Sequence, residues 1–102
     1  MPAAARGSST DSVSTGHGCD ATTVTDECSG NVFVNGKGSV RFDDAVHIHT
    51  YPVGRSCVPH APTMSDNCSS TVFINGKKAA FKGSKYSGHE ITSGSDNVFI
   101  GA

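Results

Sequence analysis

The chain has 102 residues, a formal net charge of −1 and 35% hydrophobic residues, which is the size of one small domain. It contains no Leu and no Trp, which argues against a helical bundle, because Leu is a leading helix former. It also lacks the run of about eighteen apolar residues that a transmembrane helix needs, and its eight scattered Lys and Arg residues form no basic surface for nucleic acid. With so few large apolar residues, the core needs an added constraint: a metal ion, disulfides or a partner.

Three segments of the chain repeat a short hydrophobic core. Residues 28–37 (CSGNVFVNGK) match residues 68–77 (CSSTVFINGK), and a third copy covers residues 94–101 (GSDNVFIG). Each copy predicts a strand at Val-Phe-Val or Val-Phe-Ile. In the first two copies the strand runs into Asn-Gly, which favours a two-residue type I′ hairpin turn because both residues need positive φ. The return strands are expected over residues 37–42 and 77–82.

The two ends of the chain are expected to form the third hairpin together. Residues 77–84 (KKAAFKGS) resemble residues 1–8 (MPAAARGS), so the N-terminus looks like a return strand without an outgoing one. Pairing of residues 2–7 with residues 98–101 would close a ring of three hairpin-like units and remove an exposed edge. Three unrelated hairpins in a sandwich are the alternative. The predicted fold is therefore all-β and a single domain over 1–102, with repeats at 8–42, 43–82 and 83–102 and with 1–7 closing the ring.

All five histidines fall in loops between the predicted strands. Imidazole and thiolate groups are the common ligands of a tetrahedral zinc ion. No paired CxxC motif is present, but equivalent loops of a three-unit ring converge on one axis, where each can supply a ligand. The histidines are His17, His47, His49, His60 and His89, and the cysteines are Cys19, Cys28, Cys57 and Cys68.

The repeated Val-Phe-Ile/Val cores, the Asn-Gly turns and the segment Pro2-Ala-Ala-Ala-Arg-Gly7 resemble the PAAR-repeat proteins. The resemblance extends from residue 2 to residue 102. It implies a small pseudo-threefold β cone or prism whose base sits on a trimeric β-helical spike and whose apex holds a metal ion through three His and one Cys. Residues 38–42 and 78–82 lack the family's Pro-Ala-Ala-Arg pattern, which indicates a divergent member, with a phage-type protein favoured over one of a type VI secretion system.

The same resemblance implies the metal ligands. His49-Thr-Tyr-Pro52 and Pro59-His60 match two of the family's ligand motifs, and Cys19 and His89 occupy the places of its Cys and its last His. Zinc is the expected metal and iron the alternative, because these donor types suit both. The expected ligands are thus Cys19, His49, His60 and His89, with His17, His47 and Cys57 as alternates.

The function implied by the resemblance is structural: a non-enzymatic tip that caps a trimeric spike or baseplate hub and pierces the outer membrane of a target cell. The partner is expected to bind the base. The N-terminus has no apolar signal region, so the protein is expected to be made in the host cytoplasm and placed in the virion's tail baseplate, with a secretion-system tail tip as the alternative. Base residues expected near the partner are Pro2, Ala3, Ala4, Gly101 and Ala102.

Two other functions stay open. A small zinc hydrolase would use a metal-bound water and a base such as Glu90 or Asp20. A secreted binding module would be stabilised by disulfides, but without a signal region thiols or metal ligands are favoured. Cys28 and Cys68 occupy corresponding positions before two strands, where a small residue suits a tight turn, and a Cys28–Cys68 disulfide is the alternative. The expected constraint on this fold is therefore metal and not a disulfide.

Overall fold

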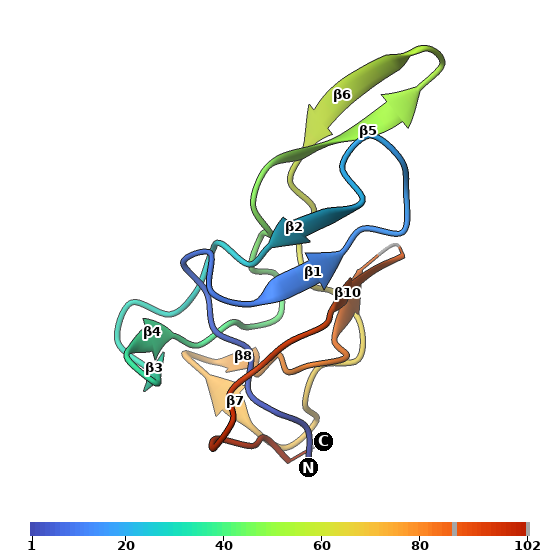
Figure 1. Ribbon diagram of the computed structural model, residues 1–102. Coiled ribbons are helices and arrows are strands. Elements are labelled where there is room, and N and C mark those ends of the chain that lie inside the picture. Colours follow the sequence, from blue (N-terminus) through green and yellow to red (C-terminus); the bar gives the residue numbers. More distant parts are fainter. Residues whose placement is uncertain (87, 102) are drawn as a thin grey trace.

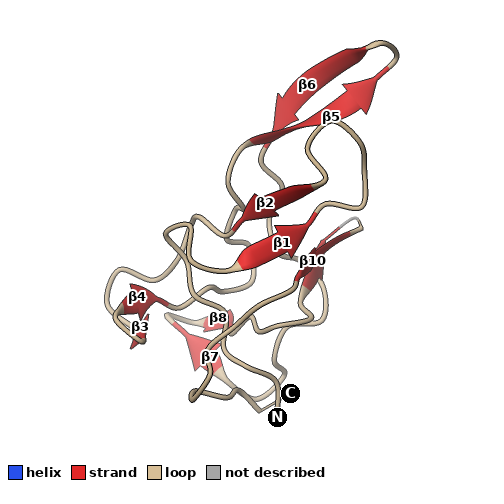
Figure 2. Cartoon of the chain, in the orientation of Figure 1, coloured by secondary structure: helices blue, strands red, loops and turns tan. Residues whose placement is uncertain are grey.

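The structure is a computed structural model that describes residues 1–86 and 88–101 as a set of short antiparallel strands (Figure 1). This part of the chain contains no helix (Figure 2), and hence none long and apolar enough to cross a membrane. The expected all-β class is confirmed. The strands are β1 (Ser12–Ser14), β2 (Thr22–Val24), β3 (Phe33–Val34), β4 (Lys37–Gly38), β5 (His49–Val53), β6 (Ser56–His60), β7 (Phe73–Ile74), β8 (Lys77–Lys78), β9 (Lys85–Tyr86) and β10 (His89–Ile91).

The strands form one four-stranded sheet, in the order β2-β1-β10-β9, and three separate hairpins. The β5–β6 hairpin projects at one end of the molecule, while β3, β4, β7, β8 and both termini lie toward the opposite end (Figure 1). The molecule measures 41 × 24 × 23 Å along its principal axes. We call the end with the termini the base and the β5–β6 end the projecting hairpin.

Both Asn-Gly turns form as predicted. Asn35 and Gly36 have φ of 53° and 79°, and Asn75 and Gly76 have φ of 54° and 78°. In each case the two residues flanking the turn pair directly, as a two-residue loop requires. The regular return strands are shorter than predicted, because after two residues each arm leaves its own hairpin and bridges another arm, as Arg41 does with Ala79.

The predicted pairing of the two chain ends is confirmed. Ala3 bridges Phe99 in antiparallel fashion. The Ala4 N–H donates to the Val98 carbonyl at 2.9 Å, and the Ile100 N–H donates to the Pro2 carbonyl at 2.8 Å. The first and last described segments therefore share one hairpin-like unit.

Three buried residues at corresponding positions of the repeats join the arms in a cycle of backbone hydrogen bonds. Ala5 N–H donates to Ala80, Ala80 N–H to Val40 and Val40 N–H back to Ala5, at 3.3, 2.9 and 3.1 Å. The buried apolar residues form two clusters, and the three residues of this cycle belong to the first. One contains Val13, Val40, Val46, Met64 and Ile91, and the other contains Ala4, Val34, Ile74, Ala79, Phe81 and Ile100.

Ser39 offers a test of this packing. It occupies the position that Ala4 and Ala79 hold in the other repeats. The N–H of each of these three residues donates, at 2.9 Å, to the carbonyl of the valine that begins a Val-Phe-Val or Val-Phe-Ile core. The Ser39 hydroxyl is buried and has no hydrogen-bond partner among the described residues. Leaving such a hydroxyl unsatisfied costs about 1–3 kcal/mol.

We therefore expect Ser39→Ala to raise the free energy of unfolding by about 1 kcal/mol in denaturant titrations. Ser29→Ala is the matched control, because the buried Ser29 hydroxyl donates to Asn75 Oδ1 at 2.6 Å and accepts from the Val32 N–H at 3.0 Å. That variant should lose stability. A loss of stability in Ser39→Ala as well would mean that its hydroxyl is satisfied after all.

Candidate metal centre

Four histidine side chains meet where the projecting hairpin joins the rest of the molecule. His49 is the first residue of β5 and His60 the last of β6, and the two pair directly across the hairpin. His89 begins β10, and His17 lies in the loop between β1 and β2. Their ligand atoms all lie within 4.8 Å of one another, and His49 and His89 are buried. We call these residues the four-histidine cluster.

The ring nitrogens of the cluster are close enough together to share one metal ion. The His49 Nε2 atom lies 2.7 Å from the His60 Nε2 and 2.9 Å from the His89 Nε2. The His17 Nε2 atom lies 3.2 Å from that of His60 and 3.3 Å from that of His49. Nitrogens bound to one tetrahedral zinc at 2.0–2.1 Å lie about 3.3 Å apart. The two distances from His17 match this spacing, and the two from His49 to His60 and His89 are shorter, so a bound cation requires only that these rings move slightly apart.

The protonation of two rings also fits a cation. The Nδ1 atom of His17 lies 2.8 Å from the Gly18 carbonyl, and that of His49 lies 2.9 Å from the His47 carbonyl. A carbonyl oxygen can only accept a hydrogen bond, so in both rings the Nδ1 atom carries the proton. In a neutral ring the Nε2 atom is then unprotonated and presents a lone pair. Two lone pairs 3.3 Å apart repel each other unless a cation lies between them. Such outer hydrogen bonds are the usual way in which a protein orients metal-binding imidazoles.

Two tyrosines border the cluster. The Tyr51 ring stacks on the His60 ring with centroids 4.3 Å apart, and Tyr86 meets the edge of His89 at 5.8 Å. Burial first, and then the three neighbouring imidazoles, lower the pKa of His60 below its ordinary value. A lowered pKa keeps this ring neutral near pH 7, the form in which it binds a metal.

The loop that carries His17 is attached to the projecting hairpin. The Asp20 carboxylate accepts hydrogen bonds from the Thr50 N–H and hydroxyl, both at 2.8 Å. These bonds hold the pKa of Asp20 below its ordinary value. Within the loop, a β-carbon at Gly16 would lie 2.7 Å from the Gly88 carbonyl, so glycine permits the close approach that brings His17 beside His89.

Cys19 lies outside the cluster, which corrects the expected ligand set. Cys19 and Cys57 form a disulfide, so neither sulfur is available as a thiolate ligand, and His17 takes the fourth place. The backbone gives the reason: φ is positive at Gly16 (71°) and at Cys19 (64°), so the loop turns between His17 and Cys19 and sends their side chains to different neighbours. The expectation of metal in place of a disulfide is corrected too, since this chain contains a disulfide.

The side chains of the other candidate residues are not members of the cluster. His47 is exposed, with its Nδ1 3.7 Å from an Asp26 carboxylate oxygen. Cys28 and Cys68 are free and half-buried, so the alternative disulfide between them is not formed. The two carboxylates considered as a base, Asp20 and Glu90, are exposed and are not among the cluster's ligand atoms.

Comparison with known proteins assigns no family and no function to this chain. No protein-family model matches the sequence, and no curated protein matches it significantly. The possible roles of the cluster therefore follow from its own residues.

Proposed function

We propose that this protein is a spike-tip protein of the PAAR-repeat type. In this role it caps the blunt end of a trimeric β-helical spike or baseplate hub in a contractile injection apparatus and helps that spike to pierce the outer membrane of a target cell. A phage tail is the favoured setting, with the protein carried in the virion, and a type VI secretion system is the alternative. The role is structural and involves neither catalysis nor nucleic acid.

The observation that carries this proposal is a set of exposed phenylalanines at corresponding positions of the three repeats. Phe33, Phe73 and Phe99 are 61%, 56% and 50% exposed. Each precedes a buried aliphatic residue of the core. Their three arms are joined by the hydrogen-bonded cycle of Ala5, Val40 and Ala80. This arrangement supports a docking surface with approximate threefold symmetry. Such a surface can meet the equivalent sites of a trimer with the same apolar contact at each.

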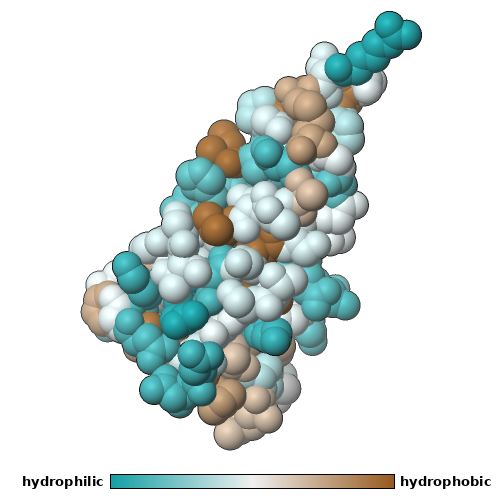
Figure 3. Space-filling view, in the orientation of Figure 1, coloured by the Kyte–Doolittle hydropathy of each residue, from teal (hydrophilic) through white to brown (hydrophobic). Residues whose placement is uncertain are grey.

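The base supplies the rest of the proposed docking surface. At the lowest end of the base, moderately hydrophobic residues lie beside hydrophilic ones, whereas the far end of the projecting hairpin is hydrophilic (Figure 3). Pro2, Ala3 and Gly101 are partly exposed there, but Ala4 is fully buried and would support the surface from below. Ala102, also expected at this surface, lies outside the described residues.

The proposed metal is zinc, with iron as the alternative, held by His17, His49, His60 and His89. Four protein ligands close a tetrahedral shell and leave no place for a reactive water, which supports a structural metal over a hydrolytic one. Its binding free energy would add directly to the stability of the fold. In the proposed cone the metal would lie at the root of the projecting hairpin, and the point would be the turn at Gly54 and Arg55.

The Cys19–Cys57 disulfide fits a tip that works outside the cell, because disulfides persist on virions and in other oxidising settings. The same bond favours the second candidate, a secreted binding module. The two candidates differ in stoichiometry: a spike tip binds as one chain on three, whereas a binding module has no such requirement.

The test is co-expression with a trimeric spike protein encoded beside this gene, followed by native mass spectrometry. We expect one copy of this chain on three spike chains. The triple variant Phe33→Ser, Phe73→Ser, Phe99→Ser should weaken the complex at least a hundredfold, because apolar anchors dominate such contacts. Ile48→Ser is the matched control, since Ile48 is 58% exposed but precedes β5, away from the base. Unchanged binding by the triple variant, or a one-to-one complex, would contradict the proposal.

A further inference from the structure

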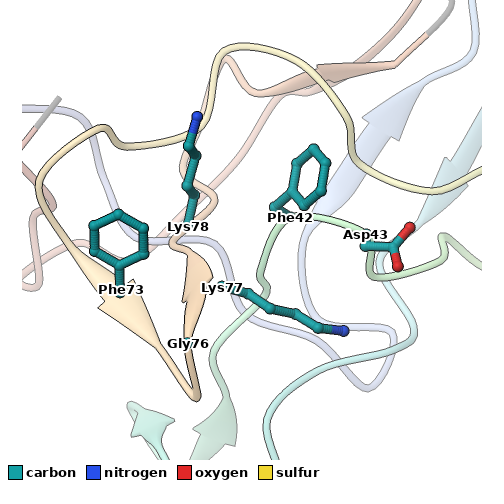
Figure 4. Close-up of a pocket in the computed structure, with 6 residues that line it drawn as sticks. All are labelled: Phe42, Asp43, Phe73, Gly76, Lys77 and Lys78. Atoms are coloured by element: carbon teal, nitrogen blue, oxygen red, sulfur yellow. The ribbon is translucent and has the colours of Figure 1, made fainter.

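A groove at the side of the base shares Phe73 with the proposed docking surface, but its other side chains take no part in that docking. Its volume is about 470 Å³, which falls in the range of small-ligand sites. Phe42 and Phe73 are 39% and 56% exposed on its two walls. The lining residues are Phe42, Asp43, Phe73, Gly76, Lys77 and Lys78 (Figure 4).

The groove lies at one of three corresponding places where neighbouring arms meet. Its walls are joined by a hydrogen bond from the Phe42 N–H to the Lys78 carbonyl at 2.7 Å. The same bond recurs at the two other places, from Gly7 to Gly38 and from Lys82 to Ala3, both at 2.8 Å. This backbone contact is thus alike at all three places, and the side chains decide how they differ.

Only the groove carries a second phenylalanine and a second lysine. The position of Phe42 is held by Gly7 and Lys82 at the other two places, and the position of Lys78 is held by Gly38 and Ala3. A threefold partner presents the same surface to all three places, so side chains that occur at one place only add nothing to its threefold contact. The groove is therefore suited to a partner that binds once, from the side.

The charges of the groove define the chemistry of that partner. Neither lysine ammonium forms an ion pair within the described parts of the chain, and neither does the Asp43 carboxylate. Lys78 lies between the rings of Phe73 and Phe42, and Lys77 extends below Phe42 (Figure 4). Two unpaired ammoniums beside two exposed rings complement an apolar side chain that is flanked by carboxylates.

We propose that this groove binds an acidic peptide segment of a second protein, with an aromatic or branched side chain of the peptide between Phe42 and Phe73. A peptide suits it better than an anionic membrane. Each lysine near a charged membrane contributes only about 1 kcal/mol, and Asp43 opposes them. In a peptide complex Asp43 can instead accept a hydrogen bond from a backbone N–H.

The experiment uses the 102-residue chain labelled with ¹⁵N. The probe is the peptide acetyl-Asp-Glu-Phe-Glu-Asp-amide. We expect saturable chemical-shift changes at the amides of Phe42, Asp43, Lys77 and Lys78. Replacing the acidic residues of the peptide by Asn and Gln, or its Phe by Ser, should each weaken binding about tenfold.

Two variants and one matched control locate the site in the protein. Phe42→Ser and Lys78→Glu should each weaken peptide binding about tenfold, and Lys78 is exposed enough that its variant should fold normally. Phe33→Ser should leave peptide binding unchanged, because the corresponding place next to it has Gly7 where this groove has Phe42. Equal binding of the neutral peptide, or full binding by both groove variants, would overturn the proposal.

Two further readouts separate this site from other functions. Binding to phosphatidylglycerol vesicles that Lys78→Glu abolishes, without peptide binding, would assign the groove to a membrane and overturn the peptide proposal. Phe42→Ser should still bind the trimeric spike, because Phe42 is not one of the three repeated phenylalanines. Failure of spike binding in the unaltered protein would therefore count against the proposed function, while peptide binding would still support the groove.

Discussion

Replacing His49 with alanine is expected to abolish metal binding. The His49 Nε2 atom lies within 2.7–3.3 Å of the other three Nε2 atoms of the cluster, so it is the common neighbour of all of them. Elemental analysis should find about one equivalent of zinc or iron in the unaltered protein and almost none in the variant. A metal held by the proposed four-histidine centre would bind only the folded chain, so its loss should lower the free energy of unfolding by about 4 kcal/mol at a thousandfold excess of free metal over Kd.

The matched control is His47→Ala. His47 is 51% exposed at its side chain and lies outside the cluster, so the variant should keep its metal and change stability by less than about 0.5 kcal/mol. A chelator provides a second readout. It should lower the Tm of the unaltered protein and of His47→Ala but leave that of His49→Ala unchanged.

His17→Ala decides which residue is the fourth ligand. The structure predicts that this variant loses the metal, because the His17 lone pair faces the other rings and no other His, Cys, Asp or Glu of the described residues joins the group. Retention of one equivalent of metal by His17→Ala, together with its loss in Cys19→Ser, would overturn the four-histidine centre and restore Cys19 as a ligand.

The double variant Cys19→Ser, Cys57→Ser is expected to lose about 4 kcal/mol of unfolding free energy. The disulfide joins residues 38 apart in the sequence, and a bridge over a loop of that length removes about this much chain entropy from the unfolded state. Denaturant titrations of the metal-free protein, with and without a reducing agent, would measure the effect. The double variant should be insensitive to the reductant.

The Cys19–Cys57 disulfide is expected to increase the affinity of the four-histidine cluster for metal. The disulfide ties the loop that carries His17 to β6, the strand that ends at His60. Holding two ligands in place before the metal arrives lowers the cost of ordering them, so the double variant should bind zinc about tenfold more weakly.

The matched control for the disulfide is Cys28→Ser, Cys68→Ser, which removes two free thiols and leaves the bridge intact. It should keep the metal affinity of the unaltered protein. If removal of the bridge and removal of the free thiols had the same effect on metal affinity, the proposed coupling would be wrong.

Much of the fold was predictable because its signals are local. Asn-Gly selects a turn through the φ preferences of two adjacent residues, and both predicted turns form. The likeness between the N-terminal segment and the second return strand was sufficient to predict that the two ends pair, as Ala3 and Phe99 do. The return strands were overestimated because the sequence pattern does not show where an arm leaves its hairpin to bridge another.

The candidate site was predictable only in part. His49, His60 and His89, which the family resemblance implied as ligands, do meet, but they lie at the ends of β5, β6 and β10 and not in loops as predicted. His17 and Cys19 were harder to tell apart, since they lie two residues from each other in one loop.

Backbone preferences and repeated patterns in the sequence thus predicted the two turns and the pairing of the chain ends, and the family resemblance predicted three of the four clustered histidines. The long-range fold decided between His17 and Cys19. It brings Cys57 on the projecting hairpin to Cys19, and it packs the loop at Gly16 against Gly88 so that His17 faces His49. Those contacts join residues far apart in the chain, and no spacing within one segment specifies them.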